Sequence, residues 1–305
     1  MSLIFFGTPE FAVPSLKALI DAGEEVSLVV TQSQKFKRNG TPIPIPVKEL
    51  AIRKAIPVLQ PEKIRDPEFI DLIKKHNPEF IIVVTYGKIL PPEILRIPQR
   101  YPINVHASLL PRYRGAAPIQ WAIIRGERFT GITTMLMDEG LDTGDILLQE
   151  KIEIKDDEDA VGLSKRLSEL GAQLLLKTIS GIRNSEIKPV PQEGEPSYAP
   201  PLKKGDGLID WKKTAREIYN LIRGTVPWPC AETFLKGERL IILKAAVVDG
   251  KGIPGRIEEV EGRFLIGTGD GLLNILELKP EGKRAMDGLS FLRGRRIERG
   301  IILGT

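Results

Sequence analysis

The chain has 305 residues, a net charge of +4 and 42% apolar residues. This length suffices for two domains of ordinary size, and this apolar content excludes an intrinsically disordered chain. The single cysteine, Cys230, excludes an intramolecular disulfide and the Cys/His spacings of a zinc site. We therefore expect a cytoplasmic protein that uses no metal.

The sequence shows no pattern typical of export or of a membrane-spanning helix. The N-terminal run MSLIFFGTPE lacks a basic segment and reaches Gly7 and Pro9 too early for the apolar core of a signal peptide. No other run approaches the roughly 18 apolar residues that a membrane-spanning helix requires. We expect a protein that neither spans nor crosses a membrane.

Short apolar runs alternate with helical patterns through the first half of the chain. We expect strands at residues 2–7, 25–31, 79–85, 102–107, 131–137 and 146–154, and helices at 11–23, 66–76, 118–125 and about 160–182. Asp66 is placed to cap one of these helices and Pro67 to begin it. This alternation predicts an α/β fold with a Rossmann-like, doubly wound, mostly parallel sheet.

A change of composition divides the chain. Residues 186–207 are rich in proline, glycine and charge without a sustained period, which is typical of an interdomain linker. A helix is expected near 214–223, and the short β-like runs after it favour a small β-barrel of OB type. We predict a catalytic domain at 1–189, a linker at 190–206 and a smaller C-terminal β-barrel domain at 207–305.

Basic residues are concentrated in the last third of the chain. Residues 1–200 carry 25 Lys and Arg against 26 Asp and Glu, whereas residues 201–305 carry 19 against 14. An excess of this size fits a surface for a polyanion such as nucleic acid. A solvated surface of mixed charge explains the same numbers equally well.

The stretch GTPEF at 7–11 occupies the position of a phosphate-binding loop after the first strand. It lacks the later glycines of GxGxxG and any GK[ST], so a dinucleotide or nucleoside triphosphate site is disfavoured there. A tight turn between strand and helix accounts for the same residues.

Asn104 and His106 lie two residues apart on an expected strand, so both side chains point to one face. A carboxamide can donate to a developing oxyanion while an imidazole beside it takes or gives a proton. Open α/β sheets bind ligands at the carboxyl ends of their strands, where this pair is expected. The alternative for His106 is a hydrogen-bonded core residue.

The loop at 137–146 offers a partner for the imidazole. It contains four carboxylates, at Asp138, Glu139, Asp142 and Asp145. Gly140 and Gly144 bracket Asp142 and would supply the unusual backbone angles that direct a short side chain toward a site. An acidic turn in water is the alternative. No GxSxG motif occurs, and Cys230 lies in the stretch VPWPC, which is no nucleophile elbow, so no covalent nucleophile is indicated.

Four stretches of the sequence resemble the folate-dependent formyltransferase family: GTPEF, VVTYGKILP, NVHASLLPRYRGAAPIQWAI and GITTMLMDEGLDTGDIL. The likeness extends over nearly the whole chain, because PWPCAETF, PGRI, GTGDGLLNILELKPEGKRAM and FLRGRR resemble the C-terminal domain of members that act on aminoacylated tRNA. Members that act on small amines share the Asn-x-His and DxGxDTG motifs, and the C-terminal sequence separates this chain from most of them.

The resemblance implies that Asn104, His106 and Asp142 are catalytic. It implies 10-formyltetrahydrofolate as the formyl donor and initiator methionyl-tRNA as the partner whose α-amine accepts the group, with no covalent enzyme intermediate. Residues of two segments are implied to bind the folate: Tyr86, Gly87, Ile89, Leu90, Ser108, Leu109, Leu110 and Pro111. We expect the protein to act as a monomer.

Two basic segments are candidates for tRNA contacts. Lys35, Lys37 and Arg38 lie in the loop after the second strand, which departs from the longer, glycine- and lysine-rich loop of bacterial family members. The residue of this loop that discriminates among tRNAs therefore stays open. The second segment contains Arg293, Arg295, Arg296 and Arg299, for which a solvated terminal strand is the alternative.

Two other functions are compatible with the sequence. One is a folate-dependent formyltransferase for a small amine or a hydrolase that releases formate, neither of which needs a basic C-terminal domain. The other is an RNA-binding protein whose first domain is not catalytic, which the presence of Asn104, His106 and Asp142 disfavours.

Overall fold

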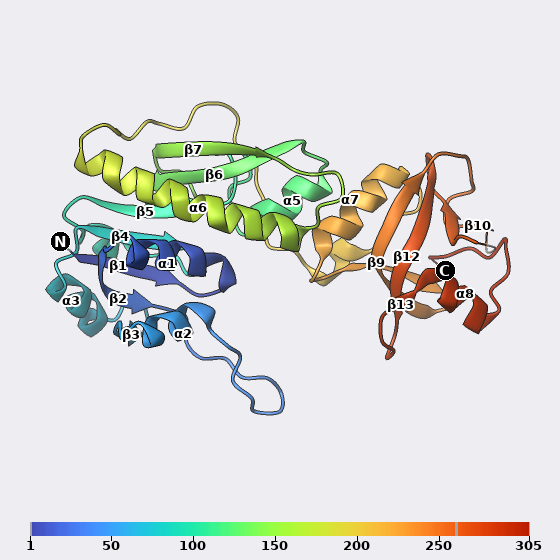
Figure 1. The fold of residues 1–305 in the computed structure, drawn as a ribbon, viewed down its shortest axis with the longest axis horizontal. Helices are drawn as coiled ribbons and strands as arrows, with labels where there is room; N and C mark the ends of the chain where they lie inside the picture. Colours follow the sequence, from blue (N-terminus) through green and yellow to red (C-terminus); the bar gives the residue numbers. More distant parts are fainter. Residues whose placement is uncertain (1, 260–261, 305) are drawn as a thin grey trace. The chain divides into compact units, whose positions relative to one another are not determined.

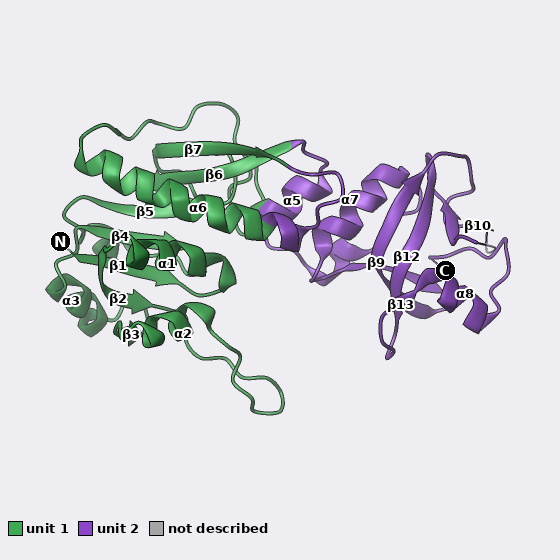
Figure 2. Cartoon of the chain, in the orientation of Figure 1, with its two compact units in different colours: residues 1–118, 129–153, 164–200 green, residues 119–128, 154–163, 201–305 purple. Residues whose placement is uncertain are grey.

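The computed structural model describes residues 2–259 and 262–304 and contains two compact units (Figure 2). Unit 1 consists of residues 1–118, 129–153 and 164–200, and unit 2 of residues 119–128, 154–163 and 201–305. Residues 190–200 thus belong to unit 1. The predicted domain limits stay predictions, because a compact unit is defined by its internal packing and not by independent folding.

Unit 1 is built on a seven-stranded sheet with the order β3-β2-β1-β4-β5-β6-β7 (Figure 1). The strands are β1 (Ser2–Gly7), β2 (Glu25–Val30), β3 (Val58–Leu59), β4 (Phe80–Val84), β5 (Tyr101–His106), β6 (Phe129–Leu136) and β7 (Ile146–Glu153). Strands β1 to β5 pair in parallel, whereas β6 is antiparallel to β5 and β7 to β6. The prediction of a mostly parallel, Rossmann-like sheet is confirmed.

Helices follow the strands of this sheet. In chain order they are the short η1 (Glu10–Ala12), α1 (Val13–Asp21), α2 (Pro46–Arg53), α3 (Pro67–Lys75), α4 (Pro92–Leu95), α5 (Pro118–Ile124) and α6 (Ala160–Arg183). Asp66 caps α3 by accepting from the backbone N–H of Glu68, and Pro67 is its first residue, as the sequence predicts.

The strand residues alternate between two buried faces. Ile4 and Phe6 of β1 pack in one cluster with Ile73 of α3 and Ile94 of α4. Leu3 and Phe5 of β1 are equally buried and point to the opposite face, since successive strand residues alternate. A strand with both faces covered must be apolar at every position, which explains the uninterrupted run of β4.

Unit 2 contains a six-stranded antiparallel sheet with the order β10-β11-β12-β9-β8, in which β13 also pairs with β12. Its elements include α7 (Ala215–Thr225), β8 (Ala231–Leu235), β9 (Glu238–Val248), β10 (Ile257–Glu259), β11 (Leu265–Gly267), β12 (Leu272–Pro280), β13 (Met286–Asp287) and α8 (Gly288–Arg295), preceded by the short η2 (Lys204–Gly207). Closure of this sheet into an OB-like barrel stays a prediction.

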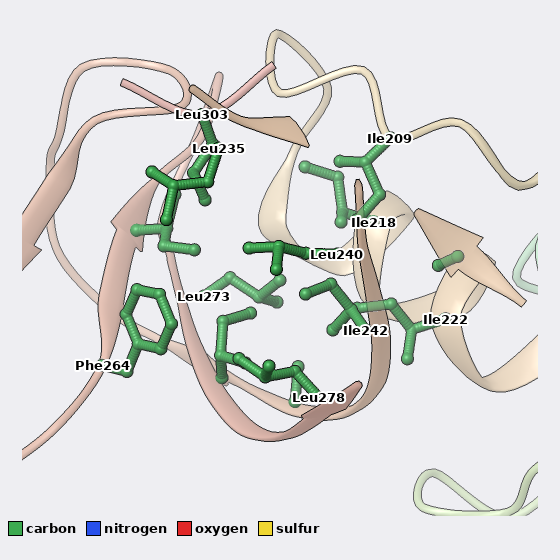
Figure 3. Packing of buried hydrophobic residues seen from close by; sticks show 14 of the residues in the cluster. Ile209, Ile218, Ile222, Leu235, Leu240, Ile242, Phe264, Leu273, Leu278 and Leu303 are labelled. Atoms are coloured by element: carbon green, nitrogen blue, oxygen red, sulfur yellow. The ribbon is translucent and has the colours of Figure 1, made fainter. Parts of the chain in front are cut away.

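One apolar cluster holds unit 2 together. Leu240 and Ile242 of β9 pack there with Leu273 of β12 and with Ile218 and Ile222 of α7 (Figure 3). The two helix residues lie four positions apart, on one side of α7, so that this side of the helix covers the sheet. Among the described residues, no helix combines the length and apolarity that crossing a membrane would require.

Candidate active site

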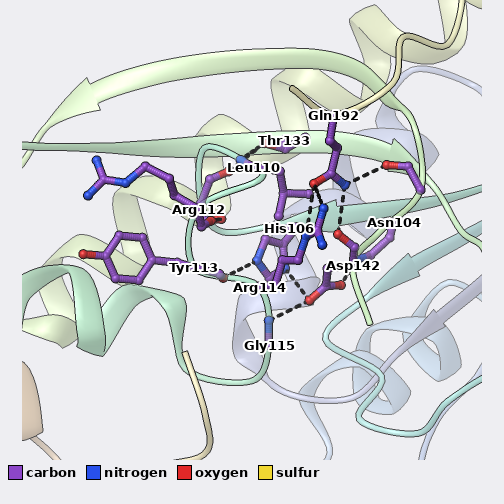
Figure 4. A network of polar contacts seen from close by, with 12 residues as sticks. Asn104, His106, Leu110, Arg112, Tyr113, Arg114, Gly115, Thr133, Asp142 and Gln192 are labelled. Atoms are coloured by element: carbon purple, nitrogen blue, oxygen red, sulfur yellow. Dashed lines mark hydrogen bonds and ion pairs between the residues drawn. The ribbon is translucent and has the colours of Figure 1, made fainter. Parts of the chain in front are cut away.

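Asn104 and His106 lie at the carboxyl end of β5, between β4 and β6 of the unit 1 sheet. His106 is buried, with 7% of its surface exposed, and Asn104 is half-buried. Their spacing of two places both side chains on one side of the sheet, as Figure 4 shows. This is the edge at which open α/β sheets bind their ligands.

Asp142 joins this pair from the loop between β6 and β7. One of its carboxylate oxygens, Oδ2, lies 3.6 Å from Nδ1 of His106, and the other, Oδ1, lies 3.5 Å from Nδ2 of Asn104 (Figure 4). The structure thus brings together the three predicted catalytic side chains, which are up to 38 positions apart in the chain. The first separation is longer than a hydrogen bond and the second is at the upper limit of one, which leaves both nitrogens available to a bound substrate.

The hydrogen bonds of His106 assign its protons. Its Nε2 lies 2.9 Å from the carbonyl oxygen of Tyr113. Because a carbonyl only accepts, Nε2 carries a hydrogen and donates it. In the neutral ring, Nδ1 is then the nitrogen with the free lone pair, and it faces Asp142. The ring can therefore take up a proton at one defined atom, beside a carboxylate that stabilises the resulting charge.

The backbone fixes the position of Asp142. Its Oδ2 accepts a hydrogen bond of 2.8 Å from the backbone N–H of Gly115. Asp142 itself has a left-handed φ of 52°, so the expectation that the neighbouring glycines supply the unusual backbone angles is wrong. Gly144 is required for space instead, because a Cβ there would lie 2.0 Å from the main-chain carbonyl oxygen of Leu136, whereas a Cβ on Gly140 would lie 1.9 Å from the Thr143 hydroxyl and displace that side chain.

The loop after β5 is held by buried polar groups of the sheet. Thr133 Oγ1 donates to the carbonyl of Ser108 at 2.6 Å and accepts from the backbone N–H of Leu110 at 3.2 Å. Ser108 Oγ donates to the carbonyl of Arg112 at 2.6 Å. Gln149, on β7, donates to the carbonyl of Leu110 at 2.8 Å. Ser108, which the resemblance assigns to folate binding, is fully buried and thus helps to shape this loop.

The polar network also contains Gln192, Arg114 and Ser197, which the sequence does not mark as site residues. Gln192 donates to the carbonyls of Asp142 and Gly144, and Arg114 donates to Gln192 (Figure 4). Ser197 Oγ accepts from the backbone N–H of Tyr113 at 2.9 Å. Gln192 and Ser197 lie in the segment predicted as a linker, and no motif in that segment marks them. Only their hydrogen bonds in the folded protein show that Gln192 and Ser197 belong to the site.

The first predicted folate segment, residues 86–90, follows β4 at the same edge of the sheet. Tyr86 and Leu90 are buried in the core of unit 1, and the ring of Phe6 contacts that of Tyr86 edge-on at 5.2 Å between centroids. Gly87 and Ile89 are exposed, and Ile89 has 76% of its surface accessible. Within this segment, Gly87 and Ile89 are therefore the residues that can meet a ligand from solvent.

Burial limits which residues of the second predicted folate segment a ligand can reach, and it raises the pKa of Tyr86 in the first segment. Leu110 is buried, whereas Leu109 and Pro111 are half-buried. Among the described residues, the hydroxyl of Tyr86 has no hydrogen-bond partner. Burial raises the pKa of Tyr86 to about 12, because the phenolate would lose its hydration.

The basic loop after β2 is folded back on itself. Phe36 and Pro42 form an antiparallel bridge, and the backbone N–H of Lys37 donates to the carbonyl of Thr41 at 2.8 Å. We call residues 35–43 the basic hairpin. Lys35, Lys37 and Arg38 are exposed on it, together with Phe36.

The C-terminal arginines lie on and after helix α8 of unit 2. Arg293 and Arg295 belong to the helix and Arg296 ends it with a φ of 50°, so the alternative of a terminal strand is wrong for these three residues. Arg295 donates to Glu238 at 2.7 Å, whereas Arg293, Arg296 and Arg299 are exposed. Lys236, Arg295 and Arg296 border a small hollow of about 190 Å³ in unit 2.

An amide donor, an imidazole and a carboxylate at the carboxyl edge of a Rossmann-like sheet define an α/β enzyme suited to acyl transfer. In the described part of the chain, no three His, Cys, Asp or Glu side chains are grouped as metal ligands. Residues 1–179 match the Formyl transferase family and residues 201–296 match "Formyl transferase, C-terminal domain". The chain belongs to the formyl transferase family, which confirms the resemblance seen in the sequence.

Curated relatives align over essentially the whole chain. A methionyl-tRNA formyltransferase of Thermodesulfovibrio yellowstonii is 55% identical over 300 residues, which cover 98% of this chain and 97% of that protein. One of Pelotomaculum thermopropionicum is 50% identical over 309 residues, with 100% and 99% covered. These alignments cover both the Rossmann-like unit and the C-terminal region of the chain.

Solved structures share the fold at lower identity. An N-formyltransferase from Helicobacter canadensis, in complex with folinic acid and dTDP-3-aminofucose, matches with a TM-score of 0.69 and 23% identity over 90% of this chain and 98% of that one. HypX from Aquifex aeolicus, in complex with tetrahydrofolic acid, gives a TM-score of 0.66 and 18% identity over 96% of this chain. The chain spans about half of HypX, since 47% of that chain is covered.

Proposed function

We propose that the chain transfers the formyl group of 10-formyltetrahydrofolate to the α-amine of initiator methionyl-tRNA, for the initiation of protein synthesis. One observation carries the proposal: Asn104, His106 and Asp142 meet at the carboxyl edge of the sheet in a chain 55% identical to a methionyl-tRNA formyltransferase. We further propose that it works as a monomer in the cytoplasm.

The reaction forms a bond between the acceptor nitrogen and the formyl carbon and breaks the bond from that carbon to N10 of the folate. The acceptor amine must be neutral to attack, and it must lose a proton afterwards. His106 takes this proton at Nδ1, the nitrogen left free by the hydrogen bond from Nε2 to Tyr113. Asp142, 3.6 Å away, stabilises the imidazolium, which can then return the proton to the departing N10.

Asn104 acts on the oxygen of the formyl group. That oxygen gains negative charge when the carbonyl carbon becomes tetrahedral, and a fixed N–H donor stabilises it. The side-chain nitrogen of Asn104 has two hydrogens, and its contact with Asp142 at 3.5 Å engages one of them only weakly. Three side chains thus divide the chemistry into charge stabilisation, proton transfer and support of the imidazole.

The residues of the carboxyl edge fit a folate. Ile89 exposes an apolar side chain there, and Gly87, at a φ of 78°, turns the backbone beside it. A flat heterocycle needs apolar surface and backbone polar groups of this kind. We assign Tyr86 and Leu90 to the support of this segment, and Ser108 to Pro111 to the border of the site.

Incubation of the purified protein with 10-formyltetrahydrofolate and either methionyl-tRNA or free amines tests the proposal. We expect formyl-methionyl-tRNA as the product. Formylation of a small amine without tRNA, or release of formate alone, would replace the proposal with one of the alternative enzymes. Binding of tRNA without any turnover would leave only an RNA-binding role.

A further inference from the structure

Gln192 connects the two loops that carry the candidate active site. Its Nε2 lies 2.9 Å from the carbonyl oxygen of Asp142 and 2.8 Å from that of Gly144. Its Oε1 accepts from Nε and Nη2 of Arg114, at 3.2 and 2.7 Å. All of these residues belong to unit 1, and Figure 4 shows Gln192 beside the three candidate catalytic side chains.

These contacts use the whole hydrogen-bonding capacity of a primary amide. The two hydrogens of Nε2 go to two carbonyls, and the two lone pairs of Oε1 receive two N–H groups. A carboxylate cannot donate to the carbonyls, and an aliphatic side chain can neither donate nor accept. Of these three kinds of side chain, only a primary amide can make all four hydrogen bonds at this position.

The contact with Asp142 bears on catalysis because the backbone of that residue is strained. A non-glycine residue at a φ of 52° persists only where its surroundings fix it. The carboxylate oxygen is fixed by the N–H of Gly115, and the main-chain carbonyl is fixed by Gln192. The side chain and the backbone of Asp142 are thus held by separate groups.

We propose that Gln192 is a positioning residue for formyl transfer, which holds the Asp142 loop with its amide nitrogen and Arg114 with its oxygen. This inference rests on the proposed function. Gln192 acts through Asp142, so it sets the distance and direction from that carboxylate to His106. Misplacement of a catalytic group by about 1 Å costs up to about 100-fold in rate.

Two variants separate the two halves of the amide. Gln192→Glu keeps an acceptor for Arg114 and loses both donors to the loop, whereas Gln192→Leu loses all four contacts. The matched control is Gln99→Leu. Gln99 also donates from Nε2 to a main-chain carbonyl, that of Asn77, at 3.3 Å. It precedes the first residue of β5 and therefore lies away from the carboxyl end of that strand, where the candidate active site is. Each protein is assayed for kcat, for KM of the folate donor and for its unfolding midpoint.

We expect both Gln192 variants to lose about 10- to 100-fold in kcat with KM for the folate within about twofold, and the unfolding midpoint and the control to change little. Equal turnover of Gln192→Glu and the wild type would overturn the proposal, as would losses that simply follow the unfolding midpoint. A wild-type protein without formyltransferase activity would instead contradict the proposed function, so the two failures are distinguishable.

Discussion

At the residue scale, the hydrogen bonds of the site determine which polar atoms remain available to a substrate. The hydrogen bond from His106 to the Tyr113 carbonyl selects Nδ1 as the basic atom, and Asp142 faces that atom. The side-chain nitrogen of Asn104 lies near the opposite oxygen of the same carboxylate. The three groups can therefore serve one reacting centre without any covalent attachment of the formyl group.

Substitution of Asn104 or His106 by alanine should lower turnover by about 10²- to 10⁴-fold each, because both residues act on charge and protons that develop in the transition state. Affinity for tRNA should stay nearly unchanged. Steady-state kinetics with saturating folate, alongside tRNA binding, measures both effects. Near wild-type turnover in either variant would remove that residue from the mechanism.

Asp142→Asn keeps the shape of the side chain and an oxygen for the Gly115 N–H, but it removes the negative charge beside His106. We expect turnover to fall by at least about 100-fold with little loss of folding stability. Glu139→Gln is the control, because it removes a charge from an exposed position of the same loop. A parallel loss in both variants would show that the net charge of the loop matters and the contact with His106 does not.

Tyr86→Phe should raise the free energy of unfolding near neutral pH by about 1 kcal/mol, because it removes a buried hydroxyl that lacks a partner among the described residues. In the wild type the folded pKa is about 12, above the unfolded value near 10. The contribution of the neutral phenol is therefore complete below pH 10 and is lost between about pH 10 and 12. Denaturant titrations across this range should show a flatter decline for the variant; an equally steep decline would contradict the buried-phenol assignment.

The sequence alone could identify the candidate catalytic residues but not the groups that hold them in place. Asn104 and His106 share a strand, so their spacing fixes a common face, and glycines mark the loop of Asp142. The partners of Asp142 are the main-chain N–H of Gly115 and the side chain of Gln192, which no residue pattern reveals. Backbone donors depend on loop conformation, and loop conformation depends on contacts distant in sequence.

At the scale of elements, segments with a clear apolar pattern are predictable from the sequence, and segments without one are not. Helix α6 and the apolar strands β1 and β4 appear where the pattern predicts them. Helix α4 was missed because its four residues are too few to show a period, and α2 because it follows a loop rich in proline. The segment 190–199 resembles a linker in composition, yet it pairs with β7 and with the loop of Arg114. Tertiary contacts order it, and composition cannot show them.

Helix α6 ends in an ionic cluster that secures the sheet. Arg183, its last residue, contacts Glu24 at 2.7 Å and Glu79 at 2.8 Å, and these carboxylates raise the pKa of its guanidinium. Glu79 has 1% of its side chain exposed and also binds Arg100. A buried carboxylate that loses its partner is strongly destabilising, whereas the same loss at the surface has little effect.

We therefore expect Arg183→Met to lower the free energy of unfolding by about 2 kcal/mol, because Glu24 and Glu79 lose charge-assisted hydrogen bonds while Glu79 keeps Arg100 as a partner. The control Lys74→Met breaks an exposed ion pair with Asp71 and should change the free energy of unfolding by less than about 0.5 kcal/mol. Adding Glu79→Gln to the Arg183 variant should recover part of the loss, because the buried charge is then absent. Urea unfolding of the four proteins checks these values, and an Arg183 variant as stable as the control would refute the role of the cluster.

At the scale of the whole molecule, the second unit cannot be removed cleanly. Arg223 of α7 donates to the main-chain carbonyls of Lys155 and Glu158, at 3.2 and 2.9 Å, and Gly224 leaves room for Ile124. Residues from the middle of the chain thus complete the packing of unit 2. Truncation after residue 205 would expose these groups, so the contribution of the C-terminal region to tRNA binding is better tested by removing charge.

Two exposed basic segments, one in each unit, are the candidates for holding tRNA. Lys37 and Arg38 are exposed on the basic hairpin, and Arg293 and Arg296 are exposed at α8. If both segments contact phosphates, the double variants Lys37→Gln/Arg38→Gln and Arg293→Gln/Arg296→Gln should each weaken binding of methionyl-tRNA and reduce the salt slope by about one unit per lost contact, because counterion release drives this part of the affinity.

The measurement is tRNA affinity between about 50 and 200 mM salt, the range over which phosphate contacts change affinity most. Lys74→Gln/Lys75→Gln is the control, since it removes the same charge from the end of α3. A slope reduced equally in all three variants would reflect net charge alone. If only the hairpin variant has a smaller salt slope than the control, the arginines of α8 are solvated and the phosphate contacts to tRNA lie in unit 1. If the α8 variant also has a smaller salt slope than the control, each unit supplies phosphate contacts. Such contacts would account for the excess of basic residues in the last third of the chain.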